Sequence, residues 1–273
     1  MTNNSNAPVP DIEKLWKALD LESSGYEYKY DQPRNTTKID EKAEEGDLDT
    51  YAIKKVSTQQ VVGTIVIRKQ NDNDKEGINE KLLAIGLGSN PRTDSNPDHS
   101  KVTKLEGTRL NTLLSAKELI NPNKDAMKLN KNDYRYAKYL LQFDISTLAS
   151  DNDSDFKKNH KLSKPDSELI KDLQLAFETF KFFIQKVEQT TKEQKFQDYK
   201  IILGYGKMGK ELLDVPINGH KNGEQYLMLL SHSPFNKHLF RPEEKYYPRH
   251  ISNANFKRID RVEQGRLHDY FLS

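Results

Sequence analysis

The chain has 273 residues, a length that allows one large domain or two small ones. Hydrophobic residues make up 34% and charged residues 31%, and the net charge of +2 gives no bulk attraction to nucleic acid. The absence of cysteine excludes disulfides and thiolate metal sites, and it is compatible with a reducing cytoplasm. No apolar stretch approaches 18 residues and no signal-peptide core opens the chain. We therefore expect a soluble, cytoplasmic protein without a membrane partner.

The N-terminal half predicts a short helix, several strands and long polar loops. Residues 11–21 form an amphipathic helix that carries the only tryptophan, Trp16, and we expect it to pack on the body, with docking of a partner as the alternative. Residues 26–49 are acidic and irregular. Two strands are expected within 51–68 and another at 82–87.

The middle of the chain alternates between polar stretches and short elements. Residues 89–103 read as a long loop that is either disordered or functional. The segment EGTRLNTLL starts a helix over 106–120, whose free amides at Thr108 favour an anion. A lysine-rich loop at 121–133, a strand at 139–145 and a polar linker at 150–162 follow.

The strongest helix signal lies at residues 165–190. Apolar residues recur at three- and four-residue steps along one face, and four phenylalanines fall between Phe177 and Phe183. Ser163, Asp166 and Ser167 can accept hydrogen bonds from the free amides at its start. We expect this helix to lie against a broad sheet.

A short apolar strand at 199–203 leads into a glycine-rich segment that carries lysines, GYGKMGK. It fits Gly-x-Gly-x-x-Gly, but a dinucleotide site is not expected, because Pro216 and Gly219 break any following helix and no β-α-β alternation precedes the strand. A Walker loop is excluded by the spacing. Two interpretations stay open: a phosphate-binding loop, or a β-hairpin whose glycines serve only the turn. We expect no bound cofactor.

The C-terminal extension, 231–273, follows an expected strand at 225–230 and is basic and aromatic. Residues 215–273 hold nine Lys/Arg against six Asp/Glu. Basic side chains interleaved with aromatic rings suit single-stranded nucleic acid, because cations pair with phosphates and bases stack on rings. The alternative is an extended tail that buries its rings on the body. The candidate contacts in this part are Lys237, Arg241, Tyr246, Tyr247 and Arg249.

Five of the seven histidines lie within residues 215–273, without the tight spacing of a metal site. A nuclease that uses these histidines is therefore an alternative function and not the expected one.

The order of strand 139–145, helix 168–187 and the glycine-rich segment, together with EGTRLNTLL, resembles the RAMP superfamily, the ferredoxin-like RNA-binding proteins of CRISPR effector complexes. The resemblance covers about residues 105–215. It implies a subunit that contacts guide or target RNA beside other protein subunits. It also implies that the segment's residues Gly204, Gly206, Lys207, Gly209 and Lys210 lie against the RNA backbone, with Arg109 nearby.

The expected fold is α+β in a single domain, with an antiparallel sheet packed by helices in a ferredoxin-like, RRM-like core over about 50–230. The expected function is RNA binding in a ribonucleoprotein, without catalysis. A protein-interaction scaffold without a ligand is the second alternative.

Overall fold

The computed structural model describes residues 10–30, 48–68, 78–91, 136–150, 153–242 and 259–272. Eight strands form one sheet in the order β1-β2-β3-β5-β4-β6-β9-β10. Their bounds are β1 (Tyr26–Tyr30), β2 (Leu48–Lys55), β3 (Val61–Arg68), β4 (Ile78–Gly88), β5 (Tyr136–Asp144), β6 (Asp198–Leu203), β9 (Leu239–Pro242) and β10 (Ile259–Arg261). A separate two-stranded ladder joins β7 (Pro216–Ile217) to β8 (His220–Lys221).

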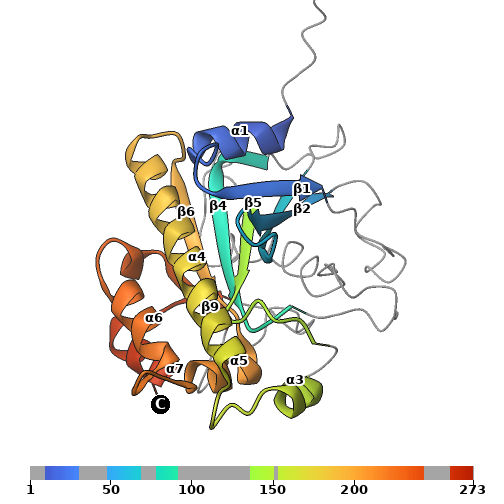
Figure 1. The fold of residues 1–273 in the computed structure, drawn as a ribbon. Helices are drawn as coiled ribbons and strands as arrows, with labels where there is room; N and C mark the ends of the chain where they lie inside the picture. The colour runs from blue at the N-terminus through green and yellow to red at the C-terminus, as the bar shows by residue number, and fades with distance from the viewer. Residues whose placement is uncertain are drawn as a thin grey trace, which may run out of the picture.

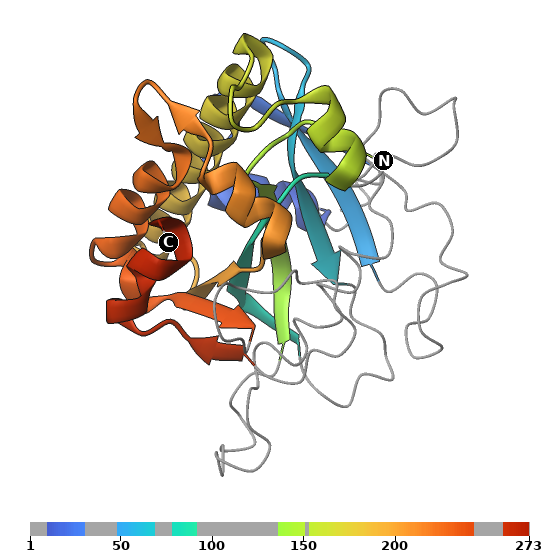
Figure 2. The same ribbon diagram turned by 90° about the horizontal axis from the view of Figure 1, so that it is seen from below.

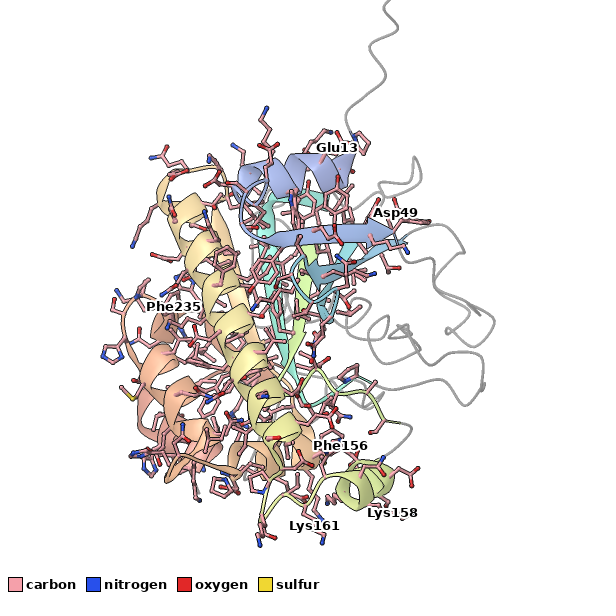
Figure 3. The ribbon with its side chains drawn as sticks, viewed as in Figure 1. Glu13, Asp49, Phe156, Lys158, Lys161 and Phe235 are labelled. Carbon is pink, nitrogen blue, oxygen red and sulfur yellow. The ribbon has the colours of Figure 1, made fainter. Side chains whose placement is uncertain are left out.

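The helices gather mainly on one face of this sheet (Figure 1). They are α1 (Asp11–Ala18), α3 (Asp153–Asn159), α4 (Ser167–Lys192), α5 (Gly206–Leu213), α6 (Asn222–Ser231) and α7 (Leu267–Leu272), with 3-10 turns η2 (Phe235–Lys237) and η3 (Gln264–Arg266). The long helix α4 runs alongside the central strand β4, and α5, α6 and α7 lie together beside it (Figures 1 and 2). Figure 3 shows that α1, with Glu13, and α3, with Lys158, lie at opposite ends of the molecule.

The centre of the sheet is parallel. Strand β4 pairs in parallel with β5 on one side and with β6 on the other, and β6 pairs in parallel with β9. Parallel strands are covered on both faces, so they read as continuous apolar runs. Residues 82–88 of β4 show this pattern, because all of them are buried and none is polar. Helix α4 provides the connection from β5 to β6, which a parallel pair requires.

The expected helix at 165–190 is confirmed as α4. Asp166 is its N-cap, and its carboxylate accepts a hydrogen bond of 2.7 Å from the backbone N–H of Leu169. Phe180 and Phe183 are fully buried and make ring contacts with Phe143 on β5. Burial of one such side chain stabilises the fold by roughly 1.5–3 kcal/mol. The apolar stripe of α4 therefore holds the helix on the sheet.

Most strand predictions are also confirmed. The two strands within 51–68 are β2 and β3, and the strands at 82–87, 139–145 and 199–203 are β4, β5 and β6. The N-terminal helix is confirmed as α1, which packs on the body through Leu15 and Trp16. The helix expected over 106–120, the loop at 121–133 and most of the loop at 89–103 lie outside the described residues.

Three local predictions are wrong. Residues 26–30 of the stretch expected to be irregular form β1, and residues 153–159 of the expected linker form α3. The apolar run at 225–230, expected to be a strand, lies in α6, where the Glu224 carboxylate accepts a hydrogen bond from the backbone N–H of Lys221. A short apolar run does not by itself separate helix from strand, and a capping residue decides for the helix here.

The mixed α+β character of the fold is confirmed, but the expected antiparallel sheet describes only its outer parts. Antiparallel pairing joins β1, β2, β3 and β5 on one side, and β9 to β10 on the other. The central pairs, β4 with β5 and β4 with β6, are parallel instead. The ferredoxin-like core is not confirmed. No helix in the described parts of the chain is long and apolar enough to cross a membrane.

Candidate functional site at the ends of strands β6 and β9

The glycine-rich segment begins where β6 ends. The backbone N–H of Gly204 donates a hydrogen bond of 2.9 Å to the carbonyl of Leu87, near the end of β4. Gly206 has φ of 63°, in the left-handed region that favours glycine, and α5 begins there. The segment is therefore the start of a helix, so the hairpin interpretation is wrong. The expected break before Pro216 is confirmed, since α5 ends at Leu213.

The segment lies where the strand order reverses. In the sheet, β5 lies on one side of β4, and β6 followed by β9 lies on the other side of β4. Open α/β sheets bind ligands outside the carboxyl ends of strands at such a reversal. The prediction that no β-α-β unit precedes the segment is wrong, because β5, α4 and β6 form one across β4.

The three glycines of the segment are buried and shape its packing. A Cβ atom on Gly209 would lie 2.3 Å from the Cβ of Tyr205, so only glycine fits beside this tyrosine. The Tyr205 hydroxyl donates a hydrogen bond of 2.7 Å to the carbonyl of Tyr270 on α7. Gly209 thus allows Tyr205 to join α5 to the C-terminal helix. Contact of Gly204, Gly206 and Gly209 with an RNA backbone stays a prediction.

The two lysines of the segment have different surroundings. Lys207 is exposed, and none of the described residues forms an ion pair with it. The Nζ of Lys210 lies 3.6 Å from the Asp214 carboxylate, and the Lys210 side chain is only 12% exposed. Burial lowers the pKa of Lys210, against the opposing effect of Asp214. Asp214 also pairs with Lys221 at 2.8 Å. Of the two lysines, Lys207 is the one accessible to a phosphate.

We expect Lys207→Ala and Lys210→Ala to differ in their effect on single-stranded RNA binding. Loss of one phosphate contact should reduce the slope of log affinity against log salt by about 0.7 for Lys207→Ala. Lys210→Ala should leave the slope unchanged, because Lys210 faces Asp214. Lys207→Ala should stay within about 0.5 kcal/mol of the wild-type free energy of unfolding, because Lys207 is exposed. Equal slopes for both variants and the wild type would remove Lys207 from the site.

The structure describes two of the candidate contacts in the C-terminal extension. Arg241 is buried, and its guanidinium carbon lies 5.2 Å from the ring centroid of Tyr270, an arrangement that stabilises α7 against β9. Lys237 is exposed in η2. The remaining candidates, Arg109, Tyr246, Tyr247 and Arg249, lie outside the described residues.

A second group of residues was missed by sequence reasoning. The Nζ of Lys200 on β6 lies 5.2 Å from the ring centroid of Phe240 on β9, and Arg261 on β10 is the partner of Phe240 in the β9–β10 register. Phe240 also pairs in register with Ile202, so all three side chains lie on the sheet face opposite α4. We name Lys200, Phe240 and Arg261 the basic–aromatic surface.

The members of the basic–aromatic surface are open to solvent to different degrees. Lys200 and Phe240 are half-buried and Arg261 is exposed. Burial lowers the pKa of Lys200, which Asp198 opposes. The guanidinium of Arg261 donates a hydrogen bond of 2.6 Å to the carbonyl of Lys237, which holds it beside η2. In the sequence, the apolar residues Tyr199 and Ile201 flank Lys200, and this alternation indicates that Lys200 lies on the opposite face of the strand. The pairing of β6 with β9, which brings Phe240 beside Lys200, was not predicted.

Two of the described histidines, His238 and His220, make contacts within the fold. His238 stacks on the Tyr199 ring at 4.1 Å, and its Nδ1 lies 3.3 Å from the Asp198 carboxylate. His220 lies 2.9 Å from Glu224 at the start of α6. Within the described ranges, no three or more His, Asp or Glu side chains gather in a way that could hold a metal ion.

A buried carboxylate, Asp172, joins α4 to the chain that follows β5. Its side chain accepts hydrogen bonds from the Ser146 hydroxyl at 2.5 Å, from the Thr147 backbone N–H at 3.1 Å and from the Thr147 hydroxyl. Asp172 is 4% exposed. This network orders the chain just after β5. Strand β5 pairs with β4, and the end of β4 contacts the glycine-rich segment through Leu87.

Comparison with protein-family models, with curated proteins and with solved structures found no match for this chain.

Proposed function

We propose that this protein binds single-stranded RNA, without catalysis, as a subunit of a cytoplasmic ribonucleoprotein. The observation that carries the proposal is the basic–aromatic surface, in which two cations flank one aromatic ring on a single sheet face. Lys207 and Lys237, which are also exposed, add positive charge near the ends of β6 and η2.

The chemistry of this surface matches the two parts of a nucleotide. Lys200 and Arg261 can each pair with a phosphate, and Phe240 offers a ring on which a base can stack. Stacking of one base contributes roughly 1–3 kcal/mol and tolerates any base, because every base has an aromatic face. Sheet faces with exposed aromatic rings are a recurrent platform for single-stranded RNA, as in RRM domains.

The resemblance of residues 105–215 to the RAMP superfamily supports the same proposal and makes it more specific. Under that resemblance the RNA is a guide or its target, other protein subunits share the complex, and the protein acts in CRISPR-based antiviral defence. The ferredoxin-like core belongs to this more specific part of the proposal.

We expect the double variant Lys200→Gln/Arg261→Gln to bind a single-stranded oligoribonucleotide at least about tenfold more weakly than the wild type at low salt. It should also reduce the slope of log affinity against log salt by about 1.4, because two phosphate contacts are lost. Fluorescence anisotropy across a salt series measures both quantities.

The matched control is Lys164→Gln/Lys171→Gln, which removes the same net charge from exposed positions before and within α4. Its affinity and slope should stay within twofold of the wild type. If both double variants weaken binding equally, the effect is one of net charge, and the basic–aromatic surface is not the RNA site.

A further inference from the structure

Strand β1 forms one edge of the eight-stranded sheet. It pairs with β2 on its inner side, and no described strand pairs with its outer side. An edge strand presents unpaired N–H and C=O groups that can pair with another chain. The sequence of β1 is YEYKY, in which Glu27 and Lys29 are exposed and flank Tyr28. Neither charged side chain forms an ion pair with another residue in the described parts of the chain.

The sequence of β1 is complementary to itself in one antiparallel register. If two copies of β1 pair around a two-fold axis through Tyr28, Glu27 of each copy lies directly opposite Lys29 of the other. Tyr26 then lies opposite Tyr30. Opposite charges and aromatic pairs at directly opposed positions both stabilise antiparallel strands. A shift by one residue instead places tyrosines opposite charges and on the wrong face, so the register is specified.

An exposed apolar residue lies at one end of this edge. Tyr30 is 52% exposed at the end of β1. In the two-fold arrangement, Tyr30 of each copy lies opposite Tyr26 of the other, so part of each exposed ring would be covered reciprocally.

From these observations we propose that β1 is a self-association surface, through which two copies of this chain pair edge to edge and continue the sheet across a two-fold axis. The interface is isologous, as the self-complementary sequence requires. A five-residue strand gives a small interface, so the dimer is a weak one that forms at high protein concentration. Glu27 is the register partner of Lys54 on β2. In the dimer, Lys29 of the second copy would lie on the other side of Glu27, at the outer edge of the sheet.

A charge-exchange experiment tests this register. Sedimentation velocity of the full chain, from about 10 µM to about 1 mM, should show a monomer–dimer equilibrium for the wild type. Lys29→Glu and Glu27→Lys each place like charges opposite one another, so each should raise the dissociation constant at least about tenfold. The double variant Glu27→Lys/Lys29→Glu should restore wild-type association, because the opposed pairs are again of opposite sign.

An equimolar mixture of the two single variants provides the most specific result. The mixture should associate more strongly than either variant alone, since the two lysines of the Glu27→Lys chain then face the two glutamates of the Lys29→Glu chain. Circular dichroism and thermal unfolding verify that the variants stay folded. A wild type that is monomeric over the whole range would overturn the proposal. Single variants that dimerise like the wild type, or a mixture that does not associate, would overturn it equally.

Discussion

Replacement of Asp172 by alanine is expected to lower the free energy of unfolding by about 3 kcal/mol. The Asp172 carboxylate accepts hydrogen bonds from two hydroxyls and one backbone N–H, of Ser146 and Thr147. Each buried donor left without an acceptor costs roughly 1–3 kcal/mol. For a chain of this size the loss corresponds to a fall in Tm of about 6–12 °C.

The control for Asp172→Ala is Asp166→Ala, which removes a carboxylate from the same helix. Asp166 is exposed and accepts a hydrogen bond from one backbone N–H at the N-cap, so its loss should cost only about 1 kcal/mol. Denaturant unfolding of both variants gives the two free energies. If Asp172→Ala is no less stable than Asp166→Ala, the buried network does not hold α4 to the end of β5.

The pH dependence of stability should also depend on Asp172. Burial raises the pKa of its carboxyl group, against the hydrogen bonds from Ser146 and Thr147. A carboxyl group with a higher pKa in the folded state binds its proton more tightly there. The additional stability that this tighter proton binding contributes is therefore complete below the unfolded value of about 3.9 and is lost as the pH rises through the folded pKa, whereas the hydrogen bonds to the carboxylate remain. The difference in free energy of unfolding between the wild type and Asp172→Asn should therefore fall as the pH rises from the unfolded pKa to the folded pKa of Asp172. Above the folded pKa this difference should stay constant.

Gly223→Ala is the second substitution with a large expected effect, a loss of about 2 kcal/mol in the free energy of unfolding. A Cβ atom at this position would lie 2.2 Å from the carbonyl oxygen of Phe271 and 3.3 Å from the Cβ of Leu213. Alanine gains about 1 kcal/mol of helix propensity over glycine. Relief of the clash, however, requires α7 to move as a backbone unit away from α6, and overpacking of this kind costs roughly 1–3 kcal/mol or more.

Gly265→Ala is the matched control, because a Cβ atom there meets nothing within 4 Å and the residue is exposed. Its free energy of unfolding should stay within about 0.5 kcal/mol of the wild type. Thermal unfolding of the two variants side by side measures the difference. Equal stability of Gly223→Ala and the wild type would show that α7 is not packed on α6 as described.

The elements that could be predicted from the sequence are those whose signals are local. Helix α4 carries a capping aspartate, Asp166, and an apolar stripe of 3.6-residue period, and both predict the same helix. Strand β6 follows from its short β-branched run. The run at 225–230 was ambiguous, because its apolar residues fit either a strand or one side of a helix, and only the cap at Glu224 separates the two.

The elements that could not be predicted depend on pairing between distant parts of the chain. The continuous apolar run of β4 is typical of a parallel strand covered on both faces, but an antiparallel partner was assumed for it. Phe240 lies 40 residues from Lys200, and their contact exists only because β9 pairs with β6. The burial of Gly209 beside Tyr205 likewise depends on α7, whose position no local pattern gives.

The measurement that tests the proposed function most directly is the binding of the wild-type protein to a labelled single-stranded RNA across a salt series. The proposal predicts saturable binding at low salt, with log affinity falling linearly against log salt and a slope of about −1.4 or steeper, from the phosphate contacts of Lys200 and Arg261. Absence of binding at low salt, where phosphate contacts are strongest, would contradict it. Binding that does not change with salt would also contradict it, because the cations of the basic–aromatic surface would then play no part.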